Sequence, residues 1–284
     1  MTAEAQYARQ YENAQSGAVP ADISVLSSYN RVYAAIRGEY RAGRGRVIAA
    51  YDHSGFAFDD VVGFSGARLD QSDRDRTIDR LTGQVQYAIS PSLSAYAEGS
   101  GLLTNYSRPL LNGDPNRDSV SARILGGANF DLAGFLRGKI GVGYTFRNYD
   151  SPLYRNVSGF SAEAKIEYFP SELTTFTLSA GRTIEDANLG LANAFIDTRV
   201  QLRVDHELLR NLILTATAEY AGQDFFGSSL QADNWRVQFQ PQYLVNHFWR
   251  LGGLVSYYRR TDTGTSLGSN FDEWSVRLSI TLTR

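Results

Sequence analysis

The chain has 284 residues with 17 Tyr, 15 Phe and 26 Gly, and its 28 basic and 30 acidic residues give a net charge of −2. It contains no Cys, which excludes disulfides and thiolate metal sites. The near-neutral charge argues against a nucleic-acid partner, because domains that bind the phosphate backbone carry a marked basic excess. The length fits either two ordinary domains or one large all-β domain.

The hydropathy of the chain does not exclude a membrane protein. No stretch approaches the roughly 18 to 20 consecutive apolar residues of a membrane-spanning helix, and the mean hydropathy is −0.30. A strand of a membrane barrel exposes only every second residue to lipid, so its mean hydropathy resembles that of a soluble protein. Residues 1–10 lack the basic start and apolar stretch of a signal peptide, so we expect a mature or trimmed form.

Apolar and polar residues alternate with period two from one end of the chain to the other. Between Leu136 and Arg147 the even positions are apolar or Gly, and the odd ones are mostly polar, basic or Gly. Such a pattern is typical of a strand between two different environments, and helical spacing would scatter it around a cylinder. We predict strands, in chain order, at 2–12, 30–41, 45–55, 75–90, 92–104, 118–130, 135–148, 157–169, 172–183, 195–208, 211–221, 233–245, 248–260 and 271–284. The first segment alternates poorly, so twelve strands remain an alternative to fourteen.

The connections between these segments alternate in length. Short turns are predicted at 42–44, 90–92, 131–135, 170–172, 209–211 and 245–248, and longer polar loops at 13–28, 56–74, 105–118, 149–156, 183–194, 222–234 and 261–270. Short periplasmic turns and longer extracellular loops are typical of outer-membrane barrels. We therefore expect an all-β fold, a transmembrane antiparallel up-and-down β-barrel of about 14 strands, with residues 1–284 forming a single outer-membrane domain.

Aromatic residues near the strand ends predict the two boundaries of the membrane. Tyr and Trp gather where lipid headgroups meet water. The expected girdle residues are Tyr168, Trp235, Tyr243, Trp249, Phe271 and Trp274.

The residue pattern of several segments resembles that of a known family. These segments are Gln6-Tyr7-Ala8-Arg9-Gln10-Tyr11-Glu12, the stretch from Val32 to Arg41, and the turns Ser90-Pro91-Ser92-Leu93 and Tyr168-Phe169-Pro170-Ser171. They resemble the outer-membrane β-barrel family named putative β-barrel porin 2. The resemblance implies an outer-membrane barrel, in some members connected with exopolysaccharide export, and it includes no catalytic motif. The chain departs from many outer-membrane barrels because it does not end in Phe or Trp.

The strand parity predicts which charged residues face the interior. The expected pore-lining residues are Arg37, Glu39, Glu98, Arg123, Arg137, Lys139, Glu163, Lys165, Glu167, Arg199, Arg203, Glu219, Arg236 and Arg277. The basic excess among them predicts a mild preference for anions. Alternatively, these residues pair across the wall and stiffen it.

Catalytic and metal sites are not expected. The chain has three His residues, and His53 next to Asp52 forms no dyad because neighbouring strand residues point to opposite faces. The acidic stretch 70–75 lacks the Gly and terminal Glu of a calcium-binding loop. We expect no catalytic residue, no metal and no cofactor.

These observations predict a non-enzymatic channel or conduit of the bacterial outer membrane for small solutes or polysaccharide. The expected partners are outer-membrane lipid and small anionic solutes or polysaccharide, and no nucleic acid. The alternative is a plugged structural or adaptor barrel of an envelope assembly, such as one for exopolysaccharide export, without an open pore. The oligomeric state does not follow from the sequence.

Overall fold

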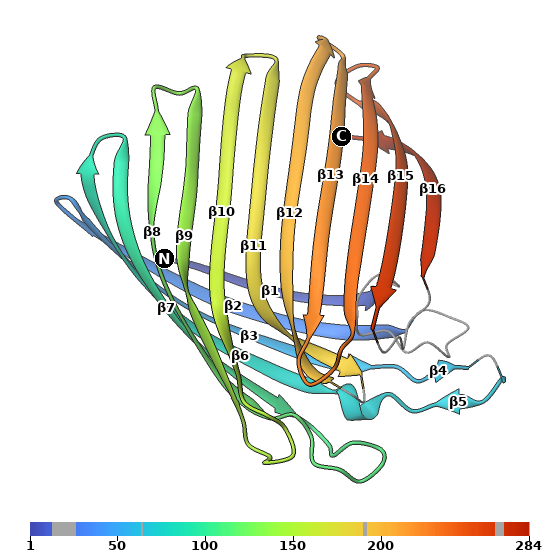
Figure 1. The fold of residues 1–284 in the computed structure, drawn as a ribbon. Helices are drawn as coiled ribbons and strands as arrows, with labels where there is room; N and C mark the ends of the chain where they lie inside the picture. Colours follow the sequence, from blue (N-terminus) through green and yellow to red (C-terminus); the bar gives the residue numbers. More distant parts are fainter. Residues whose placement is uncertain (13–26, 64, 190–191, 265–269, 284) are drawn as a thin grey trace.

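The computed structural model describes residues 1–12, 27–63, 65–189, 192–264 and 270–283. Fourteen long antiparallel strands follow one another in a single meander, each paired with its neighbour in the chain (Figure 1). Their bounds are β1 Thr2–Tyr11, β2 Ser28–Ala42, β3 Gly45–Phe58, β6 Arg76–Ser90, β7 Leu93–Tyr106, β8 Ser119–Leu132, β9 Leu136–Tyr149, β10 Val157–Ser171, β11 Thr174–Leu189, β12 Ala192–Leu209, β13 Leu212–Phe225, β14 Gln231–Leu244, β15 Trp249–Thr263 and β16 Phe271–Leu282. The prediction of fourteen strands in up-and-down order is confirmed.

The connection between β3 and β6 carries the remaining elements. It holds the two-residue strands β4 (Val61–Val62) and β5 (Arg68–Leu69) and the 3-10 turn η1 (Ser72–Arg74). Among the described residues, no helix is long and apolar enough to cross a membrane.

The two faces of the sheet differ as the alternation predicts. In β9 the even residues Ile140, Val142, Tyr144 and Phe146 are large, apolar and exposed, whereas the odd residue Arg147 is buried. Exposed apolar side chains belong on a surface that lipid covers. The convex face therefore carries the lipid-facing apolar belt, and the concave face carries the charged residues.

Short turns join the strands at one end of the sheet, and we call this the turn side; it is at the top of Figure 1. The opposite, loop side carries the longer connections. Two of the short turns contain residues with positive φ, namely Gly43 (57°) in the first and Ala133 (49°) with Gly134 (76°) in the third. Consecutive positive φ values give a hairpin turn the twist that matches its strands.

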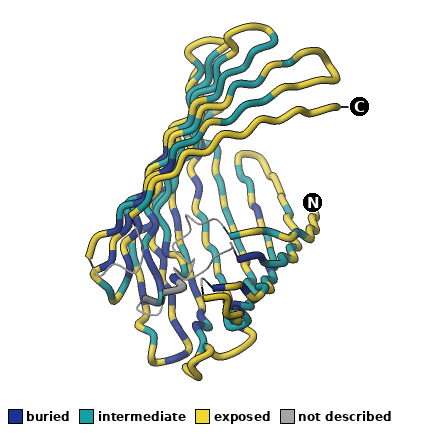
Figure 2. The backbone as a smooth tube through the Cα atoms, turned by 90° about the vertical axis from the view of Figure 1, so that its right-hand side faces the viewer, coloured by how far each residue is buried: buried dark blue, intermediate teal, exposed yellow. Residues whose placement is uncertain are grey.

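The sheet is strongly curved but has one open seam. Among the described residues, β1 pairs only with β2 and β16 pairs only with β15. Figures 1 and 2 show the two edge strands diverging, so that the chain ends on the turn side lie far from each other. The sequence predicts a closed barrel, whereas the described sheet is open between β1 and β16. Twist accumulated over the strands has carried the two edges apart.

The largest difference from the predicted elements is the hairpin of β11 and β12. The sequence predicts a loop at 183–194, but the two strands extend through most of it, and their pairing reaches Asp186 opposite Ala194 and then Leu189 opposite Ala192. Pairing between β10 and β11 ends earlier, at Ala162 opposite Arg182. The end of the hairpin, which we call the hairpin tip (183–187 and 193–198), thus separates from β10, while Phe195 to Thr198 of its β12 half stay paired with β13. Of the predicted loops, 13–28 and 261–270 lie largely outside the described residues.

Candidate functional site

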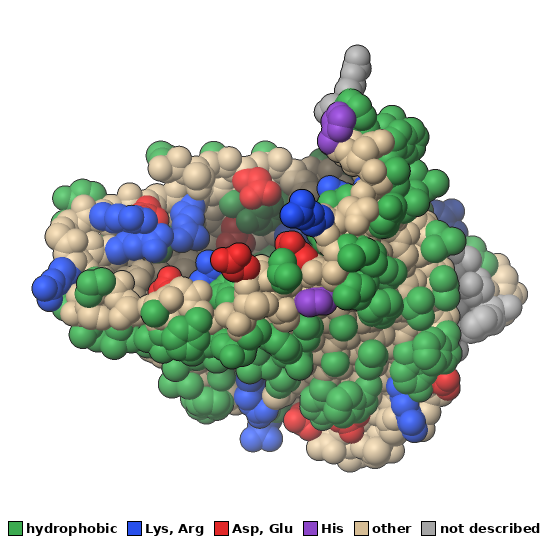
Figure 3. All heavy atoms as spheres, turned by 90° about the horizontal axis from the view of Figure 1, so that it is seen from above, with side chains coloured by type: hydrophobic (Ala, Val, Ile, Leu, Met, Phe, Trp, Pro, Cys, Tyr) green, Lys and Arg blue, Asp and Glu red, His purple; other side chains and the backbone are tan. Residues whose placement is uncertain are grey.

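The concave face forms a hollow lined with charged side chains. Figure 3 shows basic and acidic groups inside the hollow and hydrophobic side chains on the outer surface. The pairing registers place all fourteen predicted pore-lining residues on this face. Thirteen of them share strand parity with a residue that lines a cavity or joins the charged networks described below, or are such a residue themselves. Arg277 shares strand parity with Glu273, which is paired with the cavity-lining Tyr258. That they line a conducting pore remains a proposal.

One charged network crosses β7 to β10 and is organised by a tyrosine. Tyr96 leaves β7, lies flat over Gly127 and Gly141 on the next two strands, and donates a hydrogen bond to Glu163 of β10 (2.9 Å). Its ring also lies under the Lys139 ammonium, 4.6 Å from the ring centroid. Lys139 is ion-paired with Glu163 (2.5 Å). A side chain at either glycine would collide with the ring, so the two glycines make this crossing possible.

The same network extends in both directions along the wall. Arg123 lies 3.1 Å from Glu163 and 3.7 Å from Glu98, and Gln84 donates a hydrogen bond to Glu98 (3.0 Å). Nearer to the turn side, Glu167 accepts ion pairs from Arg137 (2.5 Å) and Lys165 (3.3 Å). Seven of the predicted residues therefore belong to one continuous chain of contacts or to the adjacent Glu167 group.

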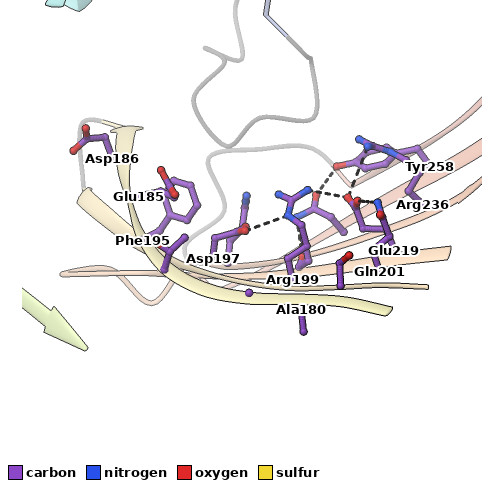
Figure 4. A pocket seen from close by; sticks show the side chains of 16 residues that line it. Ala180, Glu185, Asp186, Phe195, Asp197, Arg199, Gln201, Glu219, Arg236 and Tyr258 are labelled. Atoms are coloured by element: carbon purple, nitrogen blue, oxygen red, sulfur yellow. Dashed lines mark hydrogen bonds and ion pairs between the residues drawn. The ribbon is translucent and has the colours of Figure 1, made fainter. Parts of the chain in front are cut away.

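A second network lines a cavity of about 700 Å³ on the wall formed by β11 to β15 (Figure 4). Its centre is Glu219, which is ion-paired with Arg199 (2.8 Å) and lies 3.7 Å from Arg236. Arg199 also contacts Asp197 (3.3 Å). Asp197 was not among the predicted residues. One carboxylate oxygen of Asp197 is buried without a hydrogen-bond partner among the described residues.

The remaining predicted residues lie near the turn side or at the edge of the sheet. Glu39 is ion-paired with Arg41 and Arg46 (2.5 Å each), and Arg203 with Asp205 (2.7 Å). Arg37 and Arg277 form no ion pair with any residue that the structure describes.

In most of these ion pairs the cation is more exposed than the carboxylate, although Arg123 and Glu163 are exposed to the same extent. The exposed fractions of the side chains are 71% for Arg41 against 28% for Glu39, and 58% for Arg137 against 20% for Glu167. They are 46% for Arg199 against 9% for Glu219. Long basic side chains extend beyond the short acids that they cover. Water in the hollow therefore contacts mainly guanidinium and ammonium groups.

The hairpin tip crosses the loop-side part of the hollow. Arg147 of β9 is ion-paired with Asp186 at 2.6 Å, and the Tyr149 hydroxyl donates a hydrogen bond to the carbonyl of Asn193 (3.2 Å). Arg117 donates a hydrogen bond to the carbonyl of Ala187. A second cavity of about 390 Å³ lies on the other side of the tip, against β6 to β9. The predicted loop in this region is thus a partition inside the hollow.

Five of the six predicted girdle residues lie on the convex face. Trp235, Tyr243, Trp249, Trp274 and Tyr168 are each more than two-fifths exposed there. Their neighbours on that face support this placement, since Trp235 packs on Tyr220 and Trp274 on Tyr257.

Phe271 differs from this expectation. It is paired with Arg260 and its ring lies 5.5 Å from that of Tyr258, which lines the 700 Å³ cavity. An odd residue of β16 shares the concave face with Glu273, so the parity that places Trp274 outside places Phe271 inside. The prediction for Phe271 was wrong because nearness to a strand end does not determine the face.

The other candidates from the sequence do not assemble into a catalytic or metal site. His53 lies on the convex face, where it contacts Asp79 (2.8 Å) rather than Asp52. In the acidic stretch, Asp70 accepts a hydrogen bond from the backbone N–H of Ser72 (2.8 Å), and this bond lowers the pKa of Asp70. Within the described ranges no three His, Asp or Glu side chains gather where they could hold a metal ion.

The fold, with its apolar outer face and charged hollow, defines a class, that of outer-membrane β-barrels. The family described as putative beta-barrel porin 2 matches residues 1–284, and the chain belongs to this family. No curated protein that was compared matches the chain.

Solved structures resemble the chain in fold. The alcaligin outer-membrane receptor FauA from Bordetella pertussis is 13% identical with a TM-score of 0.55, over 89% of this chain and 50% of the receptor. The ferric yersiniabactin uptake receptor FyuA from Yersinia pestis is 12% identical with a TM-score of 0.48, over 92% of this chain and 49% of the receptor. The chain thus spans about half the length of these receptors.

Reasoning from the sequence missed two parts of the site. It did not identify Tyr96, although glycines at 127 and 141 on the concave face of adjacent strands signal a close approach by another group. It also missed the hairpin tip, because residues 183–194 contain enough polar residues to resemble a loop.

Proposed function

We propose that the barrel forms a water-filled channel of the outer membrane for small polar solutes, with a mild preference for anions. The observation that carries this proposal is the exposure of the lumenal cations above their carboxylates. The electrostatic potential in a narrow pore with a low-dielectric wall depends on the charges that face the water. Buried acids still reduce the net charge, so the preference is mild rather than absolute.

Ion selectivity in planar bilayers tests the proposal. With a salt gradient across the membrane, we expect conductance steps whose reversal potential has the sign of an anion-preferring pore. The double variant Arg137→Gln/Lys165→Gln removes two exposed lumenal cations and should shift the reversal potential toward the cation side. Arg210→Gln, in the turn between β12 and β13, changes charge by one unit outside the hollow and should leave it unaltered. A cation-preferring parent pore would refute the anion preference.

Acidic polysaccharide is a second possible cargo, since the same exposed cations would contact its carboxylates. The family resemblance noted above supports it through members connected with exopolysaccharide export. Addition of a soluble acidic polysaccharide should then interrupt the current through the open pore in a concentration-dependent way. Interruption by a neutral polysaccharide of equal length would point to size rather than charge.

The alternative is a plugged barrel with a structural role in an envelope assembly. The observation that favours it is the hairpin tip, which fills part of the hollow and is anchored by buried contacts. Conductance separates the two functions. If no steps above background occur even in a variant with a shortened β11–β12 hairpin, the channel is excluded and the structural role is retained.

A further inference from the structure

The hairpin tip is attached to the wall on one side only. Beyond Arg182, β11 no longer pairs with β10, while its pairing with β12 continues. Figure 1 shows the loop-side end of β11 turning away from β10. Gly181 comes directly before Arg182, the last residue of β11 that pairs with β10, and a Cβ atom placed at Gly181 would meet no atom within 4 Å. This position has the space and the small residue that a backbone hinge requires.

The tip separates two spaces inside the hollow. The 700 Å³ cavity lies against β12 to β15 and the 390 Å³ cavity lies against β6 to β9. Thr183, Glu185 and Asp186 line both of them. These residues therefore form a partition, and its displacement would join the two cavities.

One ion pair holds the partition against the far wall. Arg147 is nearly fully buried, with 5% of its side chain exposed, and it contacts Asp186 at 2.6 Å. Ser121 of β8 accepts a second hydrogen bond from Arg147 (2.9 Å) and fixes the guanidinium on the wall. A buried ion pair holds its geometry firmly, because separating the partners leaves each charge without compensation.

Apolar packing supports the same position. Ile184 and Ala194 of the tip are buried against Tyr149 and Val157, which belong to the loop-side ends of β9 and β10. The backbone pairing that joins β11 to β10 ends at Arg182. The tip is thus held by side chains on the side of β9 and β10, and by the backbone pairing of its β12 half with β13 on the other side.

We propose that the β11–β12 hairpin tip is a hinged barrier between two lumenal chambers, latched closed by Arg147 and Asp186. The barrier would control the passage of solute, and in this respect the inference rests on the proposed channel function. Opening moves the tip about Gly181 away from β9 and β10, on the side where β11 is unpaired, and exposes the wall beneath it.

Thiol accessibility tests the hinge without any need for conduction. The chain has no Cys, so a single Ala194→Cys substitution, at a fully buried position where the tip packs on Tyr149 and Val157, reports the displacement of the tip. In the folded, membrane-inserted protein we expect slow reaction with a charged water-soluble thiol reagent. Adding Asp186→Asn should raise the rate at least about tenfold, which corresponds to a latch of roughly 1.4 kcal/mol.

Two controls make this measurement decisive. Asp205→Asn removes an equivalent ion pair with Arg203 near the turn side and should leave the labelling rate unchanged. Gly159→Cys with Ile184→Cys should cross-link the tip to β10 through a short, reducible bifunctional thiol reagent, since the Cβ position of Gly159 lies 3.8 Å from the Cδ1 end of the Ile184 side chain. Equal labelling rates with and without Asp186→Asn, in proteins that show the same heat-modifiable folded band, would overturn the latch.

Conductance of the same variants connects the hinge to transport. The cross-linked protein should show the smallest steps, reduction should restore the parent steps, and Asp186→Asn should give the largest. If no variant conducts but labelling responds to Asp186→Asn, the channel function is wrong and the hinge stands. If all conduct equally and labelling is unchanged, the hinge is wrong and the channel stands.

Discussion

At the scale of single residues, the concave wall depends on glycines that make room for Tyr96. A Cβ atom at Gly127 would lie 2.7 Å from the Tyr96 ring, and one at Gly141 would overlap the Tyr96 hydroxyl. Tyr96 can therefore reach Glu163, three strands away, only across a wall that lacks side chains. The uncharged residues Gly127 and Gly141 thus determine how Tyr96 and Glu163 are arranged in the charged network.

Gly141→Ala tests this dependence. The new methyl group should displace Tyr96 and break its hydrogen bond to Glu163, with a loss of about 1 to 3 kcal/mol, as found for overpacked sites. Urea unfolding in lipid vesicles measures the loss. Gly126→Ala, on the convex face where no atom lies within 4 Å, is the matched control and should change stability by much less. Tyr96→Leu in the Gly141→Ala background should recover part of the loss, since the collision is with that side chain.

The assignment of the two faces is tested by adjacent residues of β14. Val237 is half exposed on the convex face, and Gln238 follows it on the concave face. Val237→Arg should cost about 2 to 4 kcal/mol in a bilayer, because it places a charge in hydrocarbon. Gln238→Arg should be tolerated, since its side chain meets water. Equal losses in vesicle unfolding would mean that the apolar belt is not covered by lipid.

At the scale of elements, the turn between β8 and β9 contains a residue under strain. Ala133 has φ of 49°, and the Phe135 N–H donates a hydrogen bond to the carbonyl of Leu132 (3.1 Å) across the turn. A non-glycine residue in this left-handed region costs roughly 1 kcal/mol, and Asn tolerates it better than Ala.

Ala133→Asn should therefore stabilise the β8–β9 hairpin by about 0.5 to 1 kcal/mol. In urea unfolding, this stabilisation should appear as a higher midpoint concentration with an unchanged m-value. Ala42→Asn, in the last residue of β2 and outside the positive-φ positions, should give no gain. A fall in the midpoint for Ala133→Asn would mean that the turn does not retain this conformation in the membrane.

The sequence predicted the strands well because each meets two different solvents along its whole length. Strand β9 is an example, since its period-two pattern determines both the element and the face of Val142. The pattern could not predict the ends of β11 and β12, because a strand that leaves the wall no longer has a lipid side. Ile184 is consequently buried inside the hollow, although its even position would place it on the convex face.

For the site, parity predicted which charges face inward but not how they are arranged. Glu219 is buried beneath Arg199 because of the register between β12 and β13. The alternation within a single strand does not reveal that register. Phe271 and Asp197 show a different limit: each shares strand parity with a residue already assigned to the concave face, Glu273 and Arg199, and the prediction did not apply that parity to them.

At the scale of the whole molecule, the open seam between β1 and β16 is incompatible with a lipid environment as it stands. A free strand edge in hydrocarbon leaves backbone N–H and C=O groups without partners, and each costs several kcal/mol. In the meander β1 runs from the turn side to the loop side and β16 runs the opposite way. The two strands are therefore antiparallel, and their pairing would preserve the alternation around the barrel.

We accordingly predict that β1 and β16 pair in the membrane. Because the chain lacks Cys, double-cysteine proteins give an unambiguous measurement. Gln6→Cys is combined in turn with Ser275→Cys, Arg277→Cys and Ser279→Cys, which sample successive registers on the concave face. One combination should cross-link in outer-membrane preparations, since a disulfide needs Cα atoms about 4.4 to 6.8 Å apart.

The control pairs Gln6→Cys with Ser256→Cys on β15, one strand farther from the seam, and should not cross-link. Cross-linking in a single β16 register would show a barrel of fourteen strands whose lumen is bounded on all sides, as a channel requires. If none of the three registers reacts while the folded protein is inserted, further strands must lie between β1 and β16. The bore would then be wider than fourteen strands allow, because barrel diameter grows with strand number.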